Sequence, residues 1–454
     1  MKKNAKKLIL IAMTVFLSMI FIDETGVAVT LPSIQSSLML ANIDVQWVMN
    51  GMFLSLAVLV LGSGKLADHI GYRRVFTWGV FVFLIASLVC AFSHSGSTLI
   101  FGRVLQGISA SMMIATYAVL ISLIFPENER GIALGTCASI ASIFLATGPF
   151  IGGALAHYLS WRGIFLINIP IGLLCLYFVY QCIEKDKIQV DVSNRFDYVG
   201  FTLFTTGFTA LIYAFMQAIN FGWGSSFIVC LFCAAAILLT AFITFERRKK
   251  NPLVHLSLFK NRHFFAGNII LLCTQVVVMS LTYWAIWLQL SLHFSPLMAG
   301  IGLLPAGLPI LITARWGGAL LDKFGPRRPI TIGTTIVLIG MIWIVATAHF
   351  ENYWLAMIGF LAYGIGAPFI ISPAIATVLG SVEANARGMA SGILNTMRQL
   401  GASLCFAIVG VVITNLNTTD QKNYTAAFTY GMCVTALFAF IACYFAYRFL
   451  KTNK

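Results

Sequence analysis

Long apolar runs recur along almost the whole chain, and they constrain its fold more than any other feature of the sequence. A run of about 20 apolar residues crosses a bilayer as a helix, because the hydrocarbon core is about 30 Å thick. Only helices and closed barrels satisfy their backbone hydrogen bonds in lipid, and barrel strands alternate apolar with polar residues, which these runs do not. The sequence therefore predicts an all-α polytopic membrane protein.

Composition leads to the same prediction, because 59% of the 454 residues are hydrophobic and 10% are charged, against about 25% charged in soluble domains. The first apolar run follows a basic segment, as in a signal peptide. It leads into Asp23-Glu24 rather than a cleavage site, so we interpret it as an uncleaved span. We expect fourteen spans, near residues 8–31, 45–65, 75–94, 97–124, 133–156, 164–183, 197–217, 225–245, 264–290, 297–319, 329–348, 354–379, 388–413 and 425–447.

Basic residues are concentrated on one side of these spans. All but five of the 29 Lys and Arg fall at the two chain ends and in alternate loops. By the positive-inside rule that side is cytoplasmic, which predicts that both termini lie inside and that the protein resides in a bacterial cytoplasmic (inner) membrane. The same placement explains the net charge of +14 without nucleic acid, which we do not expect as a partner.

An internal repeat divides the chain, because residues 64–73 (GKLADHIGYR) are echoed by residues 318–327 (GALLDKFGPR). The offset of 254 residues corresponds to eight spans, whereas a duplicated six-helix unit would give six. We explain the extra two by an inserted helical hairpin. The predicted parts are an N-terminal six-helix bundle, the hairpin with its cytoplasmic linker, and a C-terminal six-helix bundle, at residues 1–190, 191–262 and 263–454.

Both copies of the repeat are expected in cytoplasmic loops of about eight residues, between the second and third spans and between the tenth and eleventh. Glycines permit tight turns there, and an acid at a helix end can pair with an arginine or cap a neighbouring helix. A solvated turn is the alternative, but two copies in register favour gating. The predicted gating residues here are Gly64, Asp68, Gly71, Arg73, Asp322, Gly325 and Arg327.

Asp23 and Glu24 lie inside the first apolar run, and no other predicted span has an acid in its interior. A charge at that depth costs at least a few kcal/mol and usually serves ions, protons or substrate. Arg103 lies about six residues inside the outer end of the fourth span, at a depth comparable to Asp23, which we place about eight residues inside the outer end of the first. Movement of such an arginine would change the proton affinity of the carboxylate. We predict that these three residues couple transport to protons; the alternative is a static ion pair.

The fifth span contains Gly148-Pro149 and Gly152-Gly153, which combine a helix breaker with small residues. Such a segment can pack closely against another helix or act as a hinge, and the sequence leaves both open. We add these four residues to the predicted gate. Cys230 and Cys233 form a CxxC without polar flanks, which we interpret as two small buried hydrophobes rather than a metal or redox site.

Polar and aromatic residues within the spans are candidates for a substrate cavity, since mostly apolar pockets with a few convergent polar groups suit small amphipathic ligands. For each aromatic residue taken singly, packing remains the more common role. Neither a cofactor nor a metal is expected, and no GxxxxGK[ST] loop is present to bind nucleotide phosphates. The predicted substrate-binding residues are Asp23, Asn50, Trp284, Trp287, Gln289, Asn395, Arg398 and Gln399.

The order of these motifs resembles the major facilitator superfamily, and within it the fourteen-span drug:proton antiporters, over almost the whole length. In that family the helix-5 motif is associated with export, the helix-4 arginine with proton coupling, and the helix-1 acid with coupling or cationic substrates. The resemblance implies those roles for Gly148-Pro149, Arg103 and Asp23. The matching residues are Asp68 and Asp322, Arg103 with Gln106-Gly107, Gly135 with Gly148-Pro149 and Gly152-Gly153, Asp23 with Thr25 and Leu31-Pro32, and Trp161-Arg162 with Asn168-Ile169-Pro170.

The resulting expectation is a monomeric, proton-coupled exporter of small amphipathic, cationic compounds that works by alternating access in the lipid bilayer. A second hypothesis is a carrier dedicated to one metabolite, such as a siderophore or anionic compound, with Arg315 and Arg398 as ligands. A third, an intramembrane enzyme or receptor, is disfavoured because the seven histidines are scattered and form no paired set within the spans.

Overall fold

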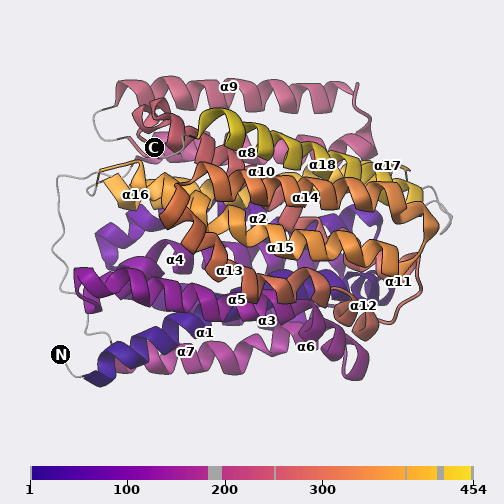
Figure 1. Cartoon of the computed structure of the whole chain (residues 1–454), viewed down its shortest axis with the longest axis horizontal. Helices are drawn as coiled ribbons and strands as arrows, with labels where there is room; N and C mark the ends of the chain where they lie inside the picture. The colour runs from indigo at the N-terminus through magenta and orange to yellow at the C-terminus, as the bar shows by residue number, and fades with distance from the viewer. Residues whose placement is uncertain (1–2, 183–196, 250–251, 384–385, 417–423, 451–454) are drawn as a thin grey trace. The chain divides into compact units, whose positions relative to one another are not determined.

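The computed structural model describes residues 3–182, 197–249, 252–383, 386–416 and 424–450. Within these ranges the chain is built from helices (Figure 1), and fourteen of its helical stretches are long and apolar enough to cross a membrane. The all-α fold class and the fourteen predicted spans are thereby confirmed. The three-part division of the chain stays a prediction.

The helices fall into two compact units, Met1–Phe196 with Phe294–Leu304 and Asp197–His293 with Pro305–Lys454. The helices of the first unit are α1 (Lys3–Leu38), α2 (Asn42–Ile70), α3 (Tyr72–Ala91), α4 (Gly96–Ile124), α5 (Glu127–Tyr158), α6 (Gly163–Leu166), α7 (Asn168–Cys182) and α12 (Pro296–Gly302). Those of the second unit are α8 (Tyr198–Phe221), α9 (Ser226–Arg248), η1 (Leu256–Lys260), α10 (Arg262–Met279), α11 (Leu281–Leu290), α13 (Leu304–Phe324), α14 (Arg327–Thr347), η2 (Ala348–Phe350), α15 (Tyr353–Gly380), α16 (Arg387–Leu404), the π-helical turn η4 (Cys405–Val409), α17 (Gly410–Leu416) and α18 (Tyr424–Phe449).

The repeated segments lie in helix ends rather than in loops, so the prediction of two eight-residue loops is wrong. Only Gly71 separates α2 from α3, and its φ of 102° reverses the chain within one residue. Gly325, with a φ of 72°, and Pro326 separate α13 from α14. Positive φ values cost glycine little, which explains why the turns need so few residues.

The first helix also extends further than its apolar run. Residue 31 was the predicted end of the span, but α1 continues through Pro32 to Leu38. Asp23 is therefore deeper within its helix than predicted. Hydropathy marks where a helix leaves lipid, whereas the backbone hydrogen bonds continue until a turn residue interrupts them, here Met39 with a φ of 50°.

The segment predicted to be an inserted hairpin contains α8 and α9, which pack against each other. The buried residues of α9 form one stripe, whereas Cys230 and Cys233 are exposed, so the prediction that these two thiols are buried is wrong. An apolar helix that packs along one stripe presents apolar side chains on its remaining faces, and this explains both the cysteines and their neighbours.

A charged cluster closes the base of the hairpin. Asp197 caps α8 by accepting from the backbone N–H of Gly200, and its Oδ1 lies 2.5 Å from Lys249 Nζ. Glu246, 3% exposed, accepts from the Val254 N–H at 2.9 Å. Burial raises the pKa of the Asp197 carboxyl, but the bonds from Lys249 and Gly200 outweigh burial and hold it below its ordinary value.

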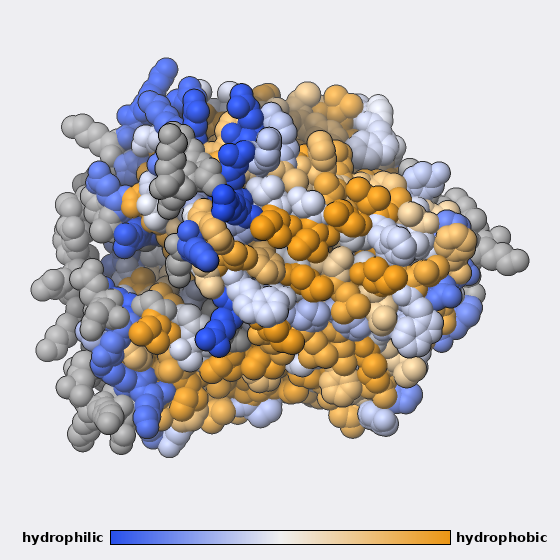
Figure 2. Space-filling model, viewed as in Figure 1, coloured by the Kyte–Doolittle hydropathy of each residue, from blue (hydrophilic) through white to orange (hydrophobic). Residues whose placement is uncertain are grey.

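Apolar side chains cover much of the helix surface, as expected of helices that face lipid. Figure 2 shows them gathered along the visible faces of α14 and α15. Ile339 and Trp343 of α14 and Trp354 and Ile358 of α15 are among the exposed hydrophobic residues. Among the described residues few charged side chains are buried, namely Asp23, Glu24, Arg103, Asp197 and Glu246, and they mark the positions where the chemistry is to be sought.

Candidate functional site

A buried ion pair joins α1 to α4 in the first unit. Arg103 Nη1 lies 2.5 Å from Asp23 Oδ2, and both side chains are 0% exposed. The contact expected between these two residues is therefore present. Removing either partner would leave an uncompensated buried charge, which costs about 3–5 kcal/mol.

Three neutral polar side chains complete the surroundings of the Asp23 carboxylate. Asn168 at the start of α7 donates to Asp23 Oδ1 at 3.1 Å, and Gln106 Nε2 donates to the same oxygen at 3.3 Å. Both amides also donate to the Ser87 hydroxyl of α3, at 3.3 and 2.9 Å respectively. We call Asp23, Arg103, Gln106, Ser87 and Asn168 the buried network. It draws on α1, α3, α4 and α7.

The arginine has further partners that fix its position. Arg103 Nε donates to the Val48 carbonyl of α2 at 2.9 Å, and Nη1 also donates to Gln106 Oε1 at 2.7 Å. The Phe165 ring centroid lies 5.8 Å from the guanidinium carbon. Arg103 Nη2 and Asn168 Oδ1 have no hydrogen-bond partner among the described residues. The network thus keeps one donor and one acceptor unused next to its ion pair.

Sequence reasoning missed three members of this network. Gln106 lies three residues after Arg103, so the two share a face of α4, and that spacing could have identified it. Gln106 and Asn168 both match family motifs in the sequence, but neither was predicted to be a site residue. No feature of the sequence identifies Ser87, because the hydroxyl of a serine in an apolar helix can hydrogen-bond to many partners.

Glu24, the second acid of the doublet, is 5% exposed. Consecutive helical residues point about 100° apart, so Asp23 and Glu24 occupy different faces of α1. Asn50 of α2 is fully buried. The structure thus places both within the interior of the first unit.

The two predicted tryptophans lie in the packed interior of the second unit. Trp284 stacks on Phe360 with the ring centroids 4.6 Å apart, and Trp287 stacks on Phe428 at 5.3 Å. Both indoles are at most 1% exposed. Their rings therefore hold α11 against α15 and α18.

The other predicted substrate residues of the second unit fall on α11 and α16. Arg398 Nη2 donates to Gln275 Oε1 of α10 at 3.4 Å, and the neighbouring Gln399 Oε1 is buried without a partner among the described residues. Gln289 and Asn395 donate to carbonyls of their own helices. Arg398 thus contacts Gln275 of α10, and Gln399 is its neighbour in the sequence; we call these three residues the α16 group.

The helix-5 glycines bring backbones together. A Cβ on Gly148 would overlap the Thr25 hydroxyl of α1, and one on Gly152 would overlap the Gly26 backbone. A Cβ on Gly153 would meet the Pro296 carbonyl of α12. The α5 helix runs through Pro149 without interruption. These contacts show close packing of α5 on α1 and α12.

The repeated segments differ in detail between the units. The Tyr72 hydroxyl donates to Asp68 at the α2–α3 turn, and Arg73 lies 5.6 Å from the Tyr180 ring centroid. In the second unit Arg327 lies 4.8 Å from the Tyr447 ring centroid. The Asp322 side chain lies outside the described residues, and Gly64 makes only ordinary contacts.

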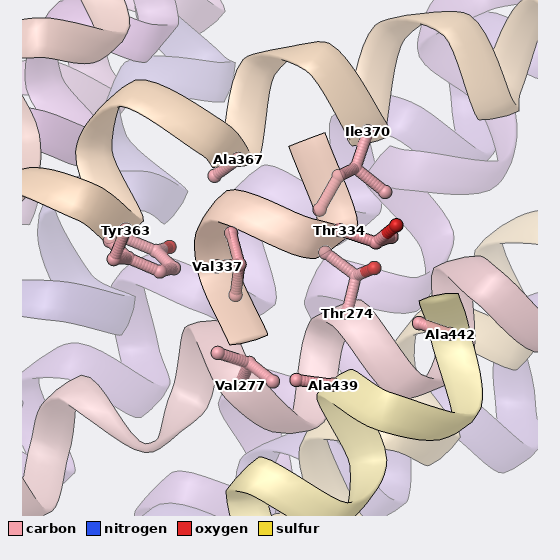
Figure 3. Close-up of a pocket in the computed structure, with 9 residues that line it drawn as sticks. All are labelled: Thr274, Val277, Thr334, Val337, Tyr363, Ala367, Ile370, Ala439 and Ala442. Atoms are coloured by element: carbon pink, nitrogen blue, oxygen red, sulfur yellow. The ribbon is translucent and has the colours of Figure 1, made fainter. Parts of the chain in front are cut away.

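One cavity lies between α10, α14, α15 and α18 (Figure 3), within the second unit. Thr274, Thr334, Tyr363 and several aliphatic residues line it. The cavity volume is about 10 Å³, enough for about one water molecule. It is therefore too small for a substrate.

The Major Facilitator Superfamily profile matches residues 11–405. The chain belongs to the major facilitator superfamily. The protein is 32% identical over 409 residues to the multidrug resistance protein Stp of Mycobacterium tuberculosis, across 89% of this chain and 75% of that protein. It is 29% identical to the tetracenomycin C resistance and export protein of Streptomyces glaucescens, with coverage of 89% and 75%.

A further relative is the riboflavin transporter RibZ of Clostridioides difficile, 28% identical across 94% of this chain and 92% of that protein. Among solved structures, the xylose transporter XylE from E. coli in a partially occluded inward-open conformation gives a TM-score of 0.68 at 14% identity, with 99% of both chains covered. The relatives and the fold of this superfamily member are those of transporters rather than enzymes. Its bacterial relatives and apolar helices indicate a multi-pass inner-membrane protein; the side of the termini stays a prediction.

Proposed function

We propose that this protein is a proton-coupled antiporter that exports small amphipathic, cationic compounds by alternating access. The observation that carries the proposal is the fully buried pair of Asp23 and Arg103, in which Asp23 accepts from Asn168 of α7 and Arg103 donates to the Val48 carbonyl of α2. Buried ionisable groups within membrane spans are expensive and are kept for function. Relatives named for multidrug resistance and for export support the direction.

The chemistry follows from the partners of the carboxylate. While Asp23 is ionised, it neutralises Arg103 and accepts from Asn168 and Gln106. A proton on Asp23 would leave Arg103 as an uncompensated buried cation, which costs several kcal/mol. Protonation therefore favours a rearrangement in which Arg103 finds another partner, and loss of the proton favours the pair. A cationic substrate near Asp23 or Glu24 would favour the same proton release.

The gating roles belong to this proposal. Alternating access requires contacts that form and break, and the helix-5 glycines let α5 approach α1 and α12 at backbone distance. The Asp68–Tyr72 contact and the Arg73–Tyr180 contact lie near the turn between α2 and α3. Ser95, which caps the start of α4, follows the other end of α3. Local contacts of this kind can separate without unfolding a helix.

The proposal is tested with the purified protein in proteoliposomes under an imposed pH gradient, with ethidium as the transported cation. We expect Asp23→Asn to abolish gradient-driven ethidium transport, because a neutral amide cannot exchange a proton. The loss of transport in Glu24→Gln measures how much the second acid contributes to proton coupling. Asp44→Asn, an acid in the first turn of α2, is the control and should transport normally. Normal coupled transport by Asp23→Asn would refute the assignment.

A second candidate is a carrier for one metabolite, which the riboflavin transporter relative favours. The α16 group would then supply ligands, since Gln399 keeps a buried acceptor next to Arg398. Arg315 is exposed on α13. A competition panel with riboflavin and several unrelated cations separates the two candidates, because a broad exporter responds to the cations and a dedicated carrier to one compound.

A further inference from the structure

A groove between the start of α3 and the end of α7 lies outside the buried network. Its volume is about 930 Å³, and it falls wholly within the first unit. Its lining residues come from these two helices alone. The first residues of α3 lie beside the last residues of α7. The lining residues are polar at that end of the groove and mostly apolar further along it.

Two guanidinium groups stand at the polar end. Arg73 and Arg74 belong to the first turn of α3, and both line the groove. Arg73 Nη2 lies 3.5 Å from the Tyr180 carbonyl of α7, which links the side chain to the opposite wall. Arginines bind phosphate through charge-assisted hydrogen bonds, and the N-terminal end of α3 adds positive partial charge at the same position.

The rest of the groove is apolar and open. Trp78 lies one helical turn beyond Arg74, and Leu173 lies two turns before Tyr180, which is about 10 Å along the axis. Trp78 and Leu173 are each 55% exposed and Tyr177 is 57% exposed. A free phosphate would leave this stretch unused, and a lipophilic cation would be repelled by the two arginines.

We propose that the groove binds an anionic phospholipid, with its phosphodiester at Arg73 and Arg74 and an acyl chain along Trp78, Tyr177 and Leu173. The basic side of the protein is predicted to face the cytoplasmic leaflet, where anionic lipids attract basic segments. A bound lipid would bridge α3 and α7, both of which contribute to the buried network. The site is independent of which compound the protein carries.

Native mass spectrometry of the full-length protein in detergent tests the proposal, with dioleoylphosphatidylglycerol, dioleoylphosphatidylcholine and inorganic phosphate as probes. We expect phosphatidylglycerol to bind more tightly than phosphatidylcholine. Arg74→Ala should weaken phosphatidylglycerol binding about fivefold, the ratio for about 1 kcal/mol per basic residue at an anionic surface. Arg74→Lys should retain most of the binding, and Leu173→Glu should weaken it without removing a cation.

The matched control is Arg328→Ala, because Arg328 occupies the same position as Arg74 in the second copy of the repeat and lies over the Phe324 ring at 4.8 Å. It should leave phosphatidylglycerol binding unchanged. Equal binding of the two lipids, displacement of phosphatidylglycerol by equimolar phosphate, or equal loss in the Arg74→Ala and Arg328→Ala proteins would each overturn the proposal.

Discussion

The two units of this transporter have interiors of different chemical character. In the first unit, Asp23 and Arg103 are 0% exposed and share their surroundings with three polar side chains. In the second unit, the interior around α11 is filled by stacked rings, such as Trp284 on Phe360. The repeat in the sequence therefore extends to helix ends and turns, but not to the chemistry of the two interiors. We infer that the interior of the first unit handles charge and that the interior around α11 supplies a rigid frame.

The largest expected effect comes from breaking the charge pair. Arg103→Ala leaves the Asp23 carboxylate buried without its cation, and we expect a loss of about 3–5 kcal/mol in unfolding free energy together with loss of coupled transport. Arg398→Ala is the counterpart in the second unit. The Arg398 side chain is only half-buried and its bond to the neutral Gln275 is 3.4 Å long, so the expected loss is smaller. Thermal unfolding of both variants in detergent measures the difference in stability. Equal losses of stability would contradict the proposed difference between the two interiors.

The second effect concerns the aromatic interior. Trp284→Ala removes a fully buried ring from its stack on Phe360, and large-to-small changes of this kind cost about 3–5 kcal/mol. Any folded fraction should still couple ethidium transport to protons, because the buried network is untouched. Trp316→Ala, at a side chain that is 56% exposed, serves as the control with little expected effect. Loss of coupling at normal stability would show that Trp284 contacts substrate or protons.

The third effect tests the contact between α5 and α1. Gly152→Ala places a Cβ against the Gly26 backbone, so the two helices must separate at a cost of about 1–3 kcal/mol. Gly135→Ala on the same helix meets no atom within 4 Å and should be neutral or slightly stabilising. Transport rates and thermal unfolding of this matched pair separate packing from helix propensity. Equal transport rates and equal stabilities of the two variants would contradict a packing role for Gly152.

Most of the fold could be predicted from the sequence, because hydropathy is a local property and each span carries its own signal. The pair of Asp23 and Arg103 could also be predicted, because the two residues lie at comparable depth within their spans. Ser87 could not, because its contact with Gln106 depends on how α3 and α4 are rotated against each other. Rotation is set by packing over the whole interface, which no short pattern encodes.

Turn lengths and aromatic roles were harder to predict for a related reason. The single residue at Gly71 reverses the chain only because its φ is positive, and composition cannot distinguish that from a longer loop. Trp284 looked like a cavity residue because its span is rich in polar and aromatic groups. Whether an indole lines a cavity or fills it depends on partners from α15, which are distant in the sequence.

A fourth, smaller effect tests the neutral members of the network. Asn168→Ala removes a donor to Asp23 at 3.1 Å, and we expect a loss of about 1–2 kcal/mol with transport retained at a reduced rate. Asn395→Ala is the control in the second unit, since Asn395 donates within its own helix, to the Ser391 carbonyl at 3.0 Å. A larger loss in Asn395→Ala than in Asn168→Ala would contradict the contrast between the two interiors.

The smallest effect concerns a charge pair at the edge of the second unit, where Lys249 meets Asp197 at 2.5 Å. Because the pKa of Asp197 is below its ordinary value in the folded protein, the pair stabilises the fold above about pH 4, and that contribution is lost as the pH falls through the folded pKa. Lys249→Gln should therefore lower stability by about 0.5–1 kcal/mol at pH 7 and by less at pH 3. Lys6→Gln removes a more exposed pair with Glu129 and should cost less at pH 7. A pH-independent loss in Lys249→Gln would mean that its ammonium acts through packing on Phe245 rather than through the carboxylate.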